Sequence, residues 1–176
     1  KDEVVAEFGD DDRIDWVEQT EMLGTGHAAR MCEPYLRQQR EGNAFILAGD
    51  GPLIRGQVLQ TLLDAHRTAG AVASTATAIL DEPAGYGRIV RDDKGEFLGI
   101  VEEADCTPAQ RRIGEVFPSY YCVEVNALLT ALGQIKNNNA KKEYYLTDIY
   151  GHIRRAGGKV IAVQAVHVVP EFQAVA

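Results

Sequence analysis

The sequence predicts an α/β fold, built on a mostly parallel sheet with helices on both faces and an added β-hairpin. Apolar runs of strand length alternate along the chain with amphipathic stretches of helical period, and short loops join them. Strands that alternate with helices in this way form parallel sheets, because each connecting helix packs back onto the sheet. The chain has 176 residues, of which 45% are hydrophobic and 25% charged, so it suits one globular domain that needs no disulfide or metal to hold its core.

The first half of the chain contains two passages from strand to helix. An apolar run ends in Gly49 and Asp50, as a buried strand does where it meets a loop. The stretch that follows is amphipathic, and Gly70 stops it as a glycine does at a helix C-terminus. Pro34 interrupts the middle of the preceding helix. We expect, in order, a strand at 14–17, a glycine loop at 24–27, a helix at 27–40, a strand at 44–50, a helix at 53–65 and a strand at 71–80.

The second half begins with two apolar runs around the turn Asp92-Asp93-Lys94-Gly95, a pattern typical of a hairpin. Thr147 is a residue type that caps helices and stands just before an amphipathic stretch. Gly157 and Gly158 follow that stretch and would end the helix. We expect the hairpin at 88–101, a strand at 120–123, a helix at 127–135, a helix from 147 to 157 and a last strand at 159–166.

Composition excludes several classes of function. The chain carries 18 basic and 26 acidic residues, a net charge of −8, and no cluster of Lys and Arg that could follow a phosphate backbone, so nucleic acid is not an expected partner. Its three cysteines form no C-x-x-C pair, which argues against a zinc site or a disulfide framework and favours the cytoplasm. No apolar run is long enough for a membrane span, and the first residues do not resemble a signal peptide.

Two features at strand and helix ends could carry chemistry. Gly24, Thr25 and Gly26 open a helix, so their backbone N–H groups could face an anion, although a glycine pair there is more often a tight turn. Asp50 follows a buried strand at the edge where open α/β sheets bind ligands, and one carboxylate suffices for Mg²⁺ when phosphates supply other ligands. The alternative is that Asp50 caps the turn through Gly51 and Pro52.

Later residues leave similar choices open. Gly87 would let a ligand approach the backbone, or it is part of a turn that leads into a strand. Glu102 and Glu103 follow a strand, so their side chains should point to opposite faces, and an inward glutamate could accept hydrogen bonds from sugar hydroxyls. The four histidines have no ligand-like spacing, so we expect no histidine metal site.

Taken in order, five blocks of sequence resemble one family. They are Glu18-Gln19-Thr20-Glu21-Met22-Leu23-Gly24-Thr25-Gly26-His27-Ala28, Ala48-Gly49-Asp50-Gly51-Pro52-Leu53-Ile54, Gly85-Tyr86-Gly87-Arg88-Ile89-Val90, Gly99-Ile100-Val101-Glu102-Glu103, and Asn137-Asn138-Asn139-Ala140 with Glu143-Tyr144-Tyr145-Leu146-Thr147-Asp148. They look like the uridylyltransferase domain of bacterial N-acetylglucosamine-1-phosphate uridylyltransferases. The resemblance runs from about residue 17 to residue 166.

This resemblance implies a Rossmann-like nucleotidyltransferase fold and a reaction. Such enzymes use Mg²⁺ to join UTP and N-acetylglucosamine 1-phosphate into UDP-N-acetylglucosamine, a cell wall precursor, with release of pyrophosphate. The roles implied for this chain place Gln19, Gly24 and Thr25 at the nucleotide, Asp50 at the metal as the catalytic residue, and Gly87, Glu102, Tyr145 and Thr147 at the amino sugar.

The chain also departs from the family pattern. The glycine-rich phosphate loop of the first βα unit has no counterpart, so residues 1–176 resemble a partial domain that would be inactive alone. Met22 replaces a glutamine that faces the uracil, and Phe117 replaces an asparagine that faces the sugar. The E-x-x-G-V-N stretch with the second metal ligand aligns loosely with the end of the chain, where Ala176 cannot be a ligand. The acyltransferase domain, through which an oligomer could form, is absent.

Two alternatives stay open. The chain could belong to a related nucleotidyltransferase that uses another nucleotide or another sugar phosphate, because Met22 and Phe117 would reshape the pocket. It could also be a non-catalytic relative that binds a nucleotide sugar.

Overall fold

Two layers of helices cover opposite faces of a seven-stranded sheet in the computed structural model, which describes residues 2–8, 11–39, 41–50 and 54–166. The strand order is β1-β6-β2-β5-β3-β4, and β7 pairs with β2. The strands are β1 (Asn43–Leu47), β2 (Ala73–Ile79), β3 (Gly87–Arg91), β4 (Phe97–Val101), β5 (Glu115–Phe117), β6 (Tyr120–Glu124) and β7 (Val160–Val166).

The expectation of a mostly parallel sheet is wrong for the described strands, because β2 with β7 is the one parallel pair among six. The reason is the position of β6. It lies between β1 and β2 and runs antiparallel to both, so β1 and β2 point in the same direction without touching. The chain from β1 through α4 (Gly56–Ala69) to β2 is therefore a strand–helix–strand crossover between two strands of the same direction, as the sequence predicted. The later strand β6 lies between these two strands in the sheet.

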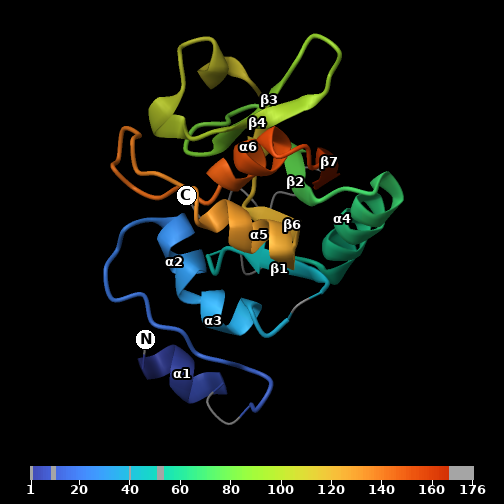
Figure 1. Cartoon of the computed structure of the whole chain (residues 1–176). Coiled ribbons are helices and arrows are strands. Elements are labelled where there is room, and N and C mark those ends of the chain that lie inside the picture. Colours follow the sequence, from blue (N-terminus) through green and yellow to red (C-terminus); the bar gives the residue numbers. More distant parts are fainter. Residues whose placement is uncertain (1, 9–10, 40, 51–53, 167–176) are drawn as a thin grey trace.

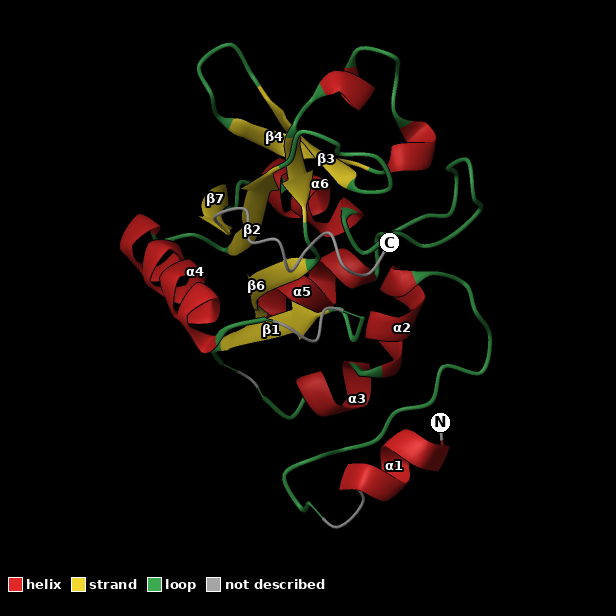
Figure 2. Cartoon of the chain, turned by 180° about the vertical axis from the view of Figure 1, so that it is seen from behind, coloured by secondary structure: helices red, strands yellow, loops and turns green. Residues whose placement is uncertain are grey.

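Alternating side chains of the central strands build one core on each face of the sheet. Ala73, Tyr121 and Val123 face a cluster that contains Leu128 and Ile149 from the helices α5 (Val125–Leu132) and α6 (Asp148–Arg155). Other residues of the same two strands face the opposite cluster, which includes Leu62 of α4; they are Ala76, Ala78, Tyr120 and Cys122. The helices α5 and α6 lie in front of the sheet in Figure 1 and behind it in Figure 2.

Local chemistry explains several element ends. Gly70 ends α4 in the left-handed conformation, with φ 58°, as its sequence position predicted. The Asp92 carboxylate accepts the backbone N–H groups of Lys94 and Glu96, both at 2.9 Å, and so fixes the turn of the β3–β4 hairpin. Pro34 splits the expected single helix into α2 (Thr25–Met31) and α3 (Glu33–Leu36).

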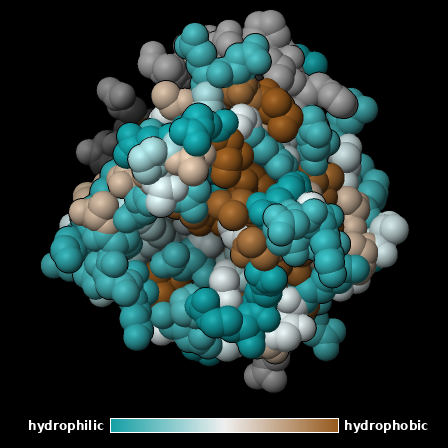
Figure 3. Space-filling model, turned by 90° about the horizontal axis from the view of Figure 1, so that it is seen from above, coloured by the Kyte–Doolittle hydropathy of each residue, from teal (hydrophilic) through white to brown (hydrophobic). Residues whose placement is uncertain are grey.

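The sequence patterns missed some elements. Residues 14–17 form no strand, which corrects that expectation, and Trp16 and Val17 are exposed there. A short helix, α1 (Asp2–Phe8), precedes this segment, and two single-turn 3₁₀ helices, η1 (Glu103–Asp105) and η2 (Gln110–Arg112), follow the hairpin. Seen from above, hydrophobic side chains gather in the middle of the molecular surface and hydrophilic ones border them (Figure 3).

Candidate functional site

The start of α2 is joined to a segment more than a hundred residues later in the chain. The Tyr144 N–H donates to the Leu23 carbonyl at 2.8 Å, and the Gly26 N–H donates to the Tyr144 carbonyl at 2.7 Å. The Leu146 N–H then donates to the Thr25 hydroxyl at 3.1 Å. The predicted nucleotide loop and the last sequence block of the family pattern therefore form one unit.

Gly24 and Gly26 are glycines because the backbone of Tyr144 lies against them. A Cβ at Gly24 would lie 2.8 Å from the Tyr144 carbonyl oxygen, and one at Gly26 would lie 2.9 Å from it. Gly24 also has φ 103°, which side chains rarely tolerate. This close packing accounts for both glycines without a ligand, so the loop alone does not indicate a phosphate site.

Gln19 reaches this unit from the preceding segment. Its side-chain Nε2 donates to the Gly24 carbonyl at 3.1 Å and lies 3.0 Å from Nδ1 of His27. The three residues predicted to meet the nucleotide, Gln19, Gly24 and Thr25, are thus in mutual contact or adjacent.

The residues predicted to meet the sugar also come together. The Thr147 hydroxyl donates to Oε1 of Glu102 at 2.8 Å. The other oxygen of that carboxylate, Oε2, lies 3.5 Å from the place where a Cβ of Gly87 would be. The same Cβ would lie 3.0 Å from Cγ2 of Ile100, so close packing within the β3–β4 hairpin accounts for this glycine. Leu146, which precedes Thr147 in the chain, connects this group to Thr25.

Burial dominates the electrostatics of Glu102. It raises the pKa of the carboxyl group, while the hydrogen bond from Thr147 and the positive charge of Lys141 act in the lowering direction. The negative charges of Asp148 and Asp105 add to the increase of the pKa. A partly desolvated carboxylate that keeps one free oxygen is well suited to accept a hydrogen bond from a sugar hydroxyl.

Tyr145 lies near Glu102, and its ring is buried. Its hydroxyl is enclosed and makes no hydrogen bond of good geometry with the described residues. Burial and the nearby Asp105 carboxylate raise the pKa of this hydroxyl to about 12. Tyr145 therefore stays a neutral phenol in the physiological range and can act as a hydrogen-bond donor.

Glu103 points to the opposite side from Glu102, as the strand alternation predicted. It does not face open solvent but forms an ion pair with the buried Arg88, with 2.8 Å between Nη2 and Oε2. Two successive residues of β3, Gly87 and Arg88, thus lie next to two successive residues after β4: Gly87 is beside Glu102, and Arg88 pairs with Glu103. The ion pair joins the start of β3 to the residue that follows Glu102.

Asp50, the predicted metal ligand, lies in a turn after β1 and is exposed. The end of β1 pairs with Tyr120 and the start of β3 pairs with Phe117, so both strand ends border residues 117–120. The turn-capping alternative involves Gly51 and Pro52, which lie outside the described residues.

No group of three His, Cys, Asp or Glu side chains in the described part of the chain is arranged to hold a metal ion. A single aspartate is still compatible with Mg²⁺, because this ion commonly takes one or two protein carboxylates and completes its shell with water and phosphate oxygens. The stretch expected to align with a second ligand, up to Ala176, also lies outside the described residues.

The two departures from the family pattern differ in structure. Met22 is 82% exposed, beside the start of α2. Phe117 is buried and packs edge-on against Tyr121, with ring centroids 4.9 Å apart. Phe117 is thus part of the core.

The structure adds three residues to the site that the sequence reasoning did not single out. The Asn139 side chain bonds the backbone of Glu143 in both directions, at 2.5 and 3.1 Å, and so holds the loop before Tyr144. Asp105 accepts the Ala140 N–H at 3.0 Å, and Lys141 lies close enough to act on Glu102. The run of three asparagines and two lysines before Glu143 was the available signal.

Comparisons with known proteins agree with the sequence blocks. No family model matches the chain. It is 43% identical over 165 residues to the bifunctional protein GlmU of Brevibacillus brevis, which covers 94% of this chain and 35% of the relative. Identity to GlmU of Clostridium acetobutylicum is 39% over 161 residues, or 92% of this chain and 35% of the relative. The resemblance to this family is therefore confirmed, for a chain that spans about a third of the length of these relatives.

A solved structure gives the same fold. The crystal structure of a UDP-glucose pyrophosphorylase complexed with UDP-glucose superposes with a TM-score of 0.68 at 19% identity, over 85% of this chain and 57% of that one. The nucleotidyltransferase fold expected from the sequence is thus confirmed. In the described part of the chain, no helix has the length and apolar character needed to cross a membrane.

Proposed function

Starting from the relationship to the GlmU proteins, we propose that this chain is part of a sugar-1-phosphate uridylyltransferase that makes UDP-N-acetylglucosamine and pyrophosphate from UTP and N-acetylglucosamine 1-phosphate. One observation carries the proposal. Hydrogen bonds and chain neighbours connect six of the residues proposed to bind the two substrates by way of Leu146, and the Glu102 carboxylate lies beside a seventh, Gly87; the six are Gln19, Gly24, Thr25, Tyr145, Thr147 and Glu102.

In this proposal the two ends of the path hold the two substrates. Gln19, Gly24 and Thr25 contact the nucleotide, while Glu102, beside Gly87, accepts a hydrogen bond from a sugar hydroxyl. Because Leu146 connects Thr25 to Thr147, the two halves of the site are held at a fixed distance. Fixed positioning of two reactants supplies a large part of the rate in phosphoryl transfer.

The proposed chemistry needs no base from this chain. The sugar phosphate is already an anion, so its oxygen can attack the α-phosphorus of UTP while pyrophosphate leaves with the bond electrons. Asp50 would hold Mg²⁺ together with phosphate oxygens, and the ion would supply charge neutralisation there. Tyr145 would act as a neutral hydrogen-bond donor near the sugar.

The sugar and the cellular location are finer parts of the proposal. The Cβ of Phe117 lies 3.7 Å from the place where a Cβ of Gly87 would be, so the proposed sugar site is apolar on this side, which suits a methyl-bearing substituent such as an acetamido group better than a bare hydroxyl. All three cysteines, Cys32, Cys106 and Cys122, are free thiols, as is usual in the reducing cytoplasm.

Pyrophosphate release tests the proposal. The purified chain and a longer product of its gene would each be assayed with a panel of nucleoside triphosphates and sugar 1-phosphates, with and without Mg²⁺. We expect the longer product to release pyrophosphate fastest with UTP and N-acetylglucosamine 1-phosphate. Absence of turnover with every pair would refute the proposal, and a preference for another pair would correct the substrates.

Binding measured on the chain itself gives a second readout. In saturation-transfer NMR, UDP-N-acetylglucosamine should receive magnetisation at both its uracil and its acetyl protons. Glu102→Gln should weaken the transfer to the sugar protons more than to the uracil protons, because Glu102 is proposed to contact only the sugar. Equal loss at both ends would contradict the division of the site.

A further inference from the structure

A cavity adjoins the proposed substrate path at Thr147. It measures about 450 Å³ and is bounded by β4, by one face of α6 and by the loop that follows α5. The β4 wall consists of Leu98, Gly99 and Ile100 and carries no charge. The polar groups come from the other two walls, with Lys136 and Asn138 from the loop and His152 and Arg155 from α6.

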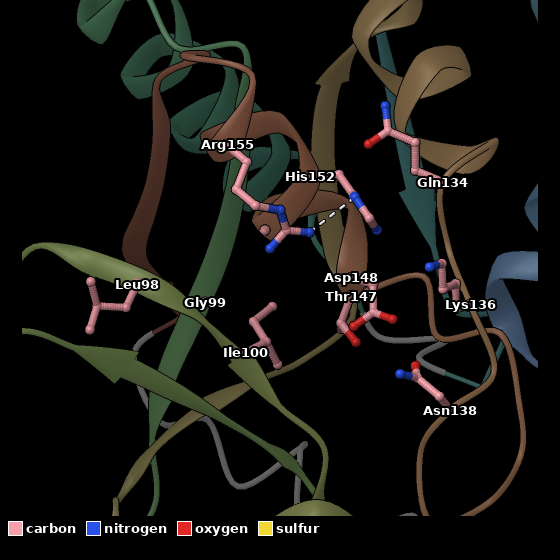
Figure 4. Close-up of a pocket in the computed structure, with 11 residues that line it drawn as sticks. Leu98, Gly99, Ile100, Gln134, Lys136, Asn138, Thr147, Asp148, His152 and Arg155 are labelled. Atoms are coloured by element: carbon pink, nitrogen blue, oxygen red, sulfur yellow. Dashed lines mark hydrogen bonds between the residues drawn. The ribbon is translucent and has the colours of Figure 1, made fainter.

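The nitrogen atoms of these side chains converge on one space. Figure 4 shows the guanidinium of Arg155 beside His152 on one side, and the nitrogen ends of Lys136 and Asn138 directed inward from the other side. Thr147 and Asp148 lie between them. Apart from Asp148, the charged groups on the walls are cations.

Arg155 is held in this orientation by two features of α6. Its Nη2 lies 3.0 Å from Nδ1 of His152. Since the guanidinium can only donate, this hydrogen bond requires that Nδ1 carry no proton. Its guanidinium also lies over Gly151, where a Cβ would be 3.3 Å from Nη1. The side chain is therefore already folded back toward the cavity and needs little reordering to bind a ligand.

The charge balance of the cavity favours an anion. Burial lowers the pKa of His152 most, and the positive charges of Arg155 and Lys136 lower it further, so the ring is neutral at pH 7. Arg155 lowers the pKa of Asp148, although burial raises it overall. With Lys136 and Arg155 positive and Asp148 negative, the walls carry a net positive charge, and protonation of His152 would increase it.

We propose that this cavity is a second ligand site that binds a small phosphate-bearing anion between Lys136, Arg155, Asn138 and His152. A planar guanidinium, an ammonium group and an amide that approach from different directions match a tetrahedral oxyanion better than a planar carboxylate. The volume is sufficient for a phosphorylated metabolite larger than the ion itself. This inference does not depend on the proposed reaction.

The position of the cavity connects it to the proposed sugar site. Thr147 lines the cavity, and its hydroxyl donates to Glu102. A ligand that shifts the start of α6 would therefore change the hydrogen bond on the Glu102 carboxylate. Occupation of the cavity is expected to alter sugar binding, a regulatory effect that can be measured separately from anion binding.

An NMR titration of the isotopically labelled chain with sulfate tests the proposal. Sulfate keeps its double charge over the relevant pH range, whereas a phosphate group itself titrates near pH 6 to 7. We expect saturable shifts of the Lys136, Gly151 and His152 signals with a dissociation constant near about 1 mM.

Matched variants locate the binding. Lys136→Gln and Arg155→Gln should each weaken sulfate binding about five- to tenfold, the loss expected for one partly exposed charge-assisted contact. Lys142→Gln and Arg154→Gln remove the same charge from the same loop and helix but do not line the cavity, so they should change the affinity by less than about twofold.

Three results would overturn the proposal. They are absence of saturable shifts at the cavity, equal weakening by the cavity variants and their controls, and sulfate shifts confined to the Gly24–Gly26 loop. Lys136 lies on a loop, so its variant is expected to fold even if Arg155→Gln perturbs α6. A phosphorylated ligand and free phosphate can be told apart by repeating the titration with inorganic phosphate and with glucosamine 6-phosphate as probes.

Discussion

The hydroxyl of Thr147 donates to the carboxylate of Glu102, 45 residues earlier in the chain, at a distance of 2.8 Å. Thr147 stands at the N-cap position of α6, yet its side chain makes no capping hydrogen bond there. The residue type predicted a helix cap. The tertiary structure uses the hydroxyl instead to position a carboxylate in the proposed sugar site.

Thr147→Val should weaken sugar binding by removing this hydrogen bond without changing the shape of the side chain. We expect KM for the sugar phosphate to rise about fivefold with a smaller change in kcat. The pKa of Glu102 should rise further, because the bond from Thr147 acts to lower it. Thr147→Ser keeps the hydroxyl and serves as the control; a serine variant as impaired as the valine variant would show that packing alone matters.

Glu102→Gln should separate function from stability. The pKa of Glu102 is raised in the folded chain, chiefly by burial, so this group stabilises the fold below its ordinary pKa and loses that contribution as the pH rises through the raised pKa. At pH 7 the neutral glutamine should therefore leave Tm unchanged or higher, although sugar binding falls. Thermal unfolding across a pH series measures this. A variant clearly less stable than the parent at neutral pH would contradict the assigned direction of the pKa shift.

Gly24→Ala should destabilise the chain by about 2–4 kcal/mol, since it adds both an unfavourable φ and an overlap with the Tyr144 backbone. Gly42→Ala isolates the first effect, because Gly42 has φ 117° with nothing within 4 Å of the added Cβ. That control should cost about 1–2 kcal/mol. Chemical denaturation gives both values, and equal costs would mean that the Tyr144 segment moves away freely.

Asp50→Asn should lower kcat by about 100-fold or more while changing KM for the sugar phosphate by less than about threefold. The reason is that Asp50 is proposed to hold the metal and not the sugar. Steady-state pyrophosphate release over a range of Mg²⁺ concentrations measures both constants. Asp81→Asn, at another exposed aspartate, is the control. Comparable losses in kcat and KM would indicate that Asp50 only shapes its turn.

Glu115 should stabilise the sheet at neutral pH and lose this effect in acid. Arg91 holds the carboxylate with two hydrogen bonds of 2.7 Å, and Thr77 donates a third of 2.7 Å. Burial raises the pKa of Glu115, but these bonds outweigh it and leave the pKa lowered. The stabilisation is thus present above the ordinary carboxyl pKa and is lost as the pH falls through the lowered one.

The matching variant is Glu115→Gln. We expect it to lower the free energy of unfolding by about 2 kcal/mol at pH 7 and by little in acid. Breaking a fully buried ion pair costs about 3–5 kcal/mol, and the loss here is smaller because Arg91 is partly exposed. Glu33→Gln breaks the exposed pair with Arg37 and should cost less than about 0.5 kcal/mol at any pH. Urea unfolding at several pH values compares the two. A pH-independent difference for Glu115→Gln would refute the assigned role.

Much of the candidate site could be predicted from the sequence because its residues lie in short blocks with a distinctive order. Gln19, Gly24 and Thr25 fall in one block, and Tyr145 and Thr147 in another. Contacts between blocks could not be predicted in the same way. The fit of Tyr144 against Gly24, and the two charges that act on Glu102 from Lys141 and Asp105, depend on loops that carry no periodic pattern.

The sequence by itself determined the alternation of strands and helices, the β3–β4 hairpin and the end of α4 at Gly70, because hydrophobic period and turn chemistry act over neighbouring residues. Only the tertiary structure decided that β6 enters between β1 and β2, since strand pairing is chosen by contacts between distant parts of the chain. It also decided that the Thr147 hydroxyl donates its hydrogen bond to Glu102 and does not cap its own helix. A side chain that can satisfy either a local or a distant partner is assigned by packing, which no local pattern contains.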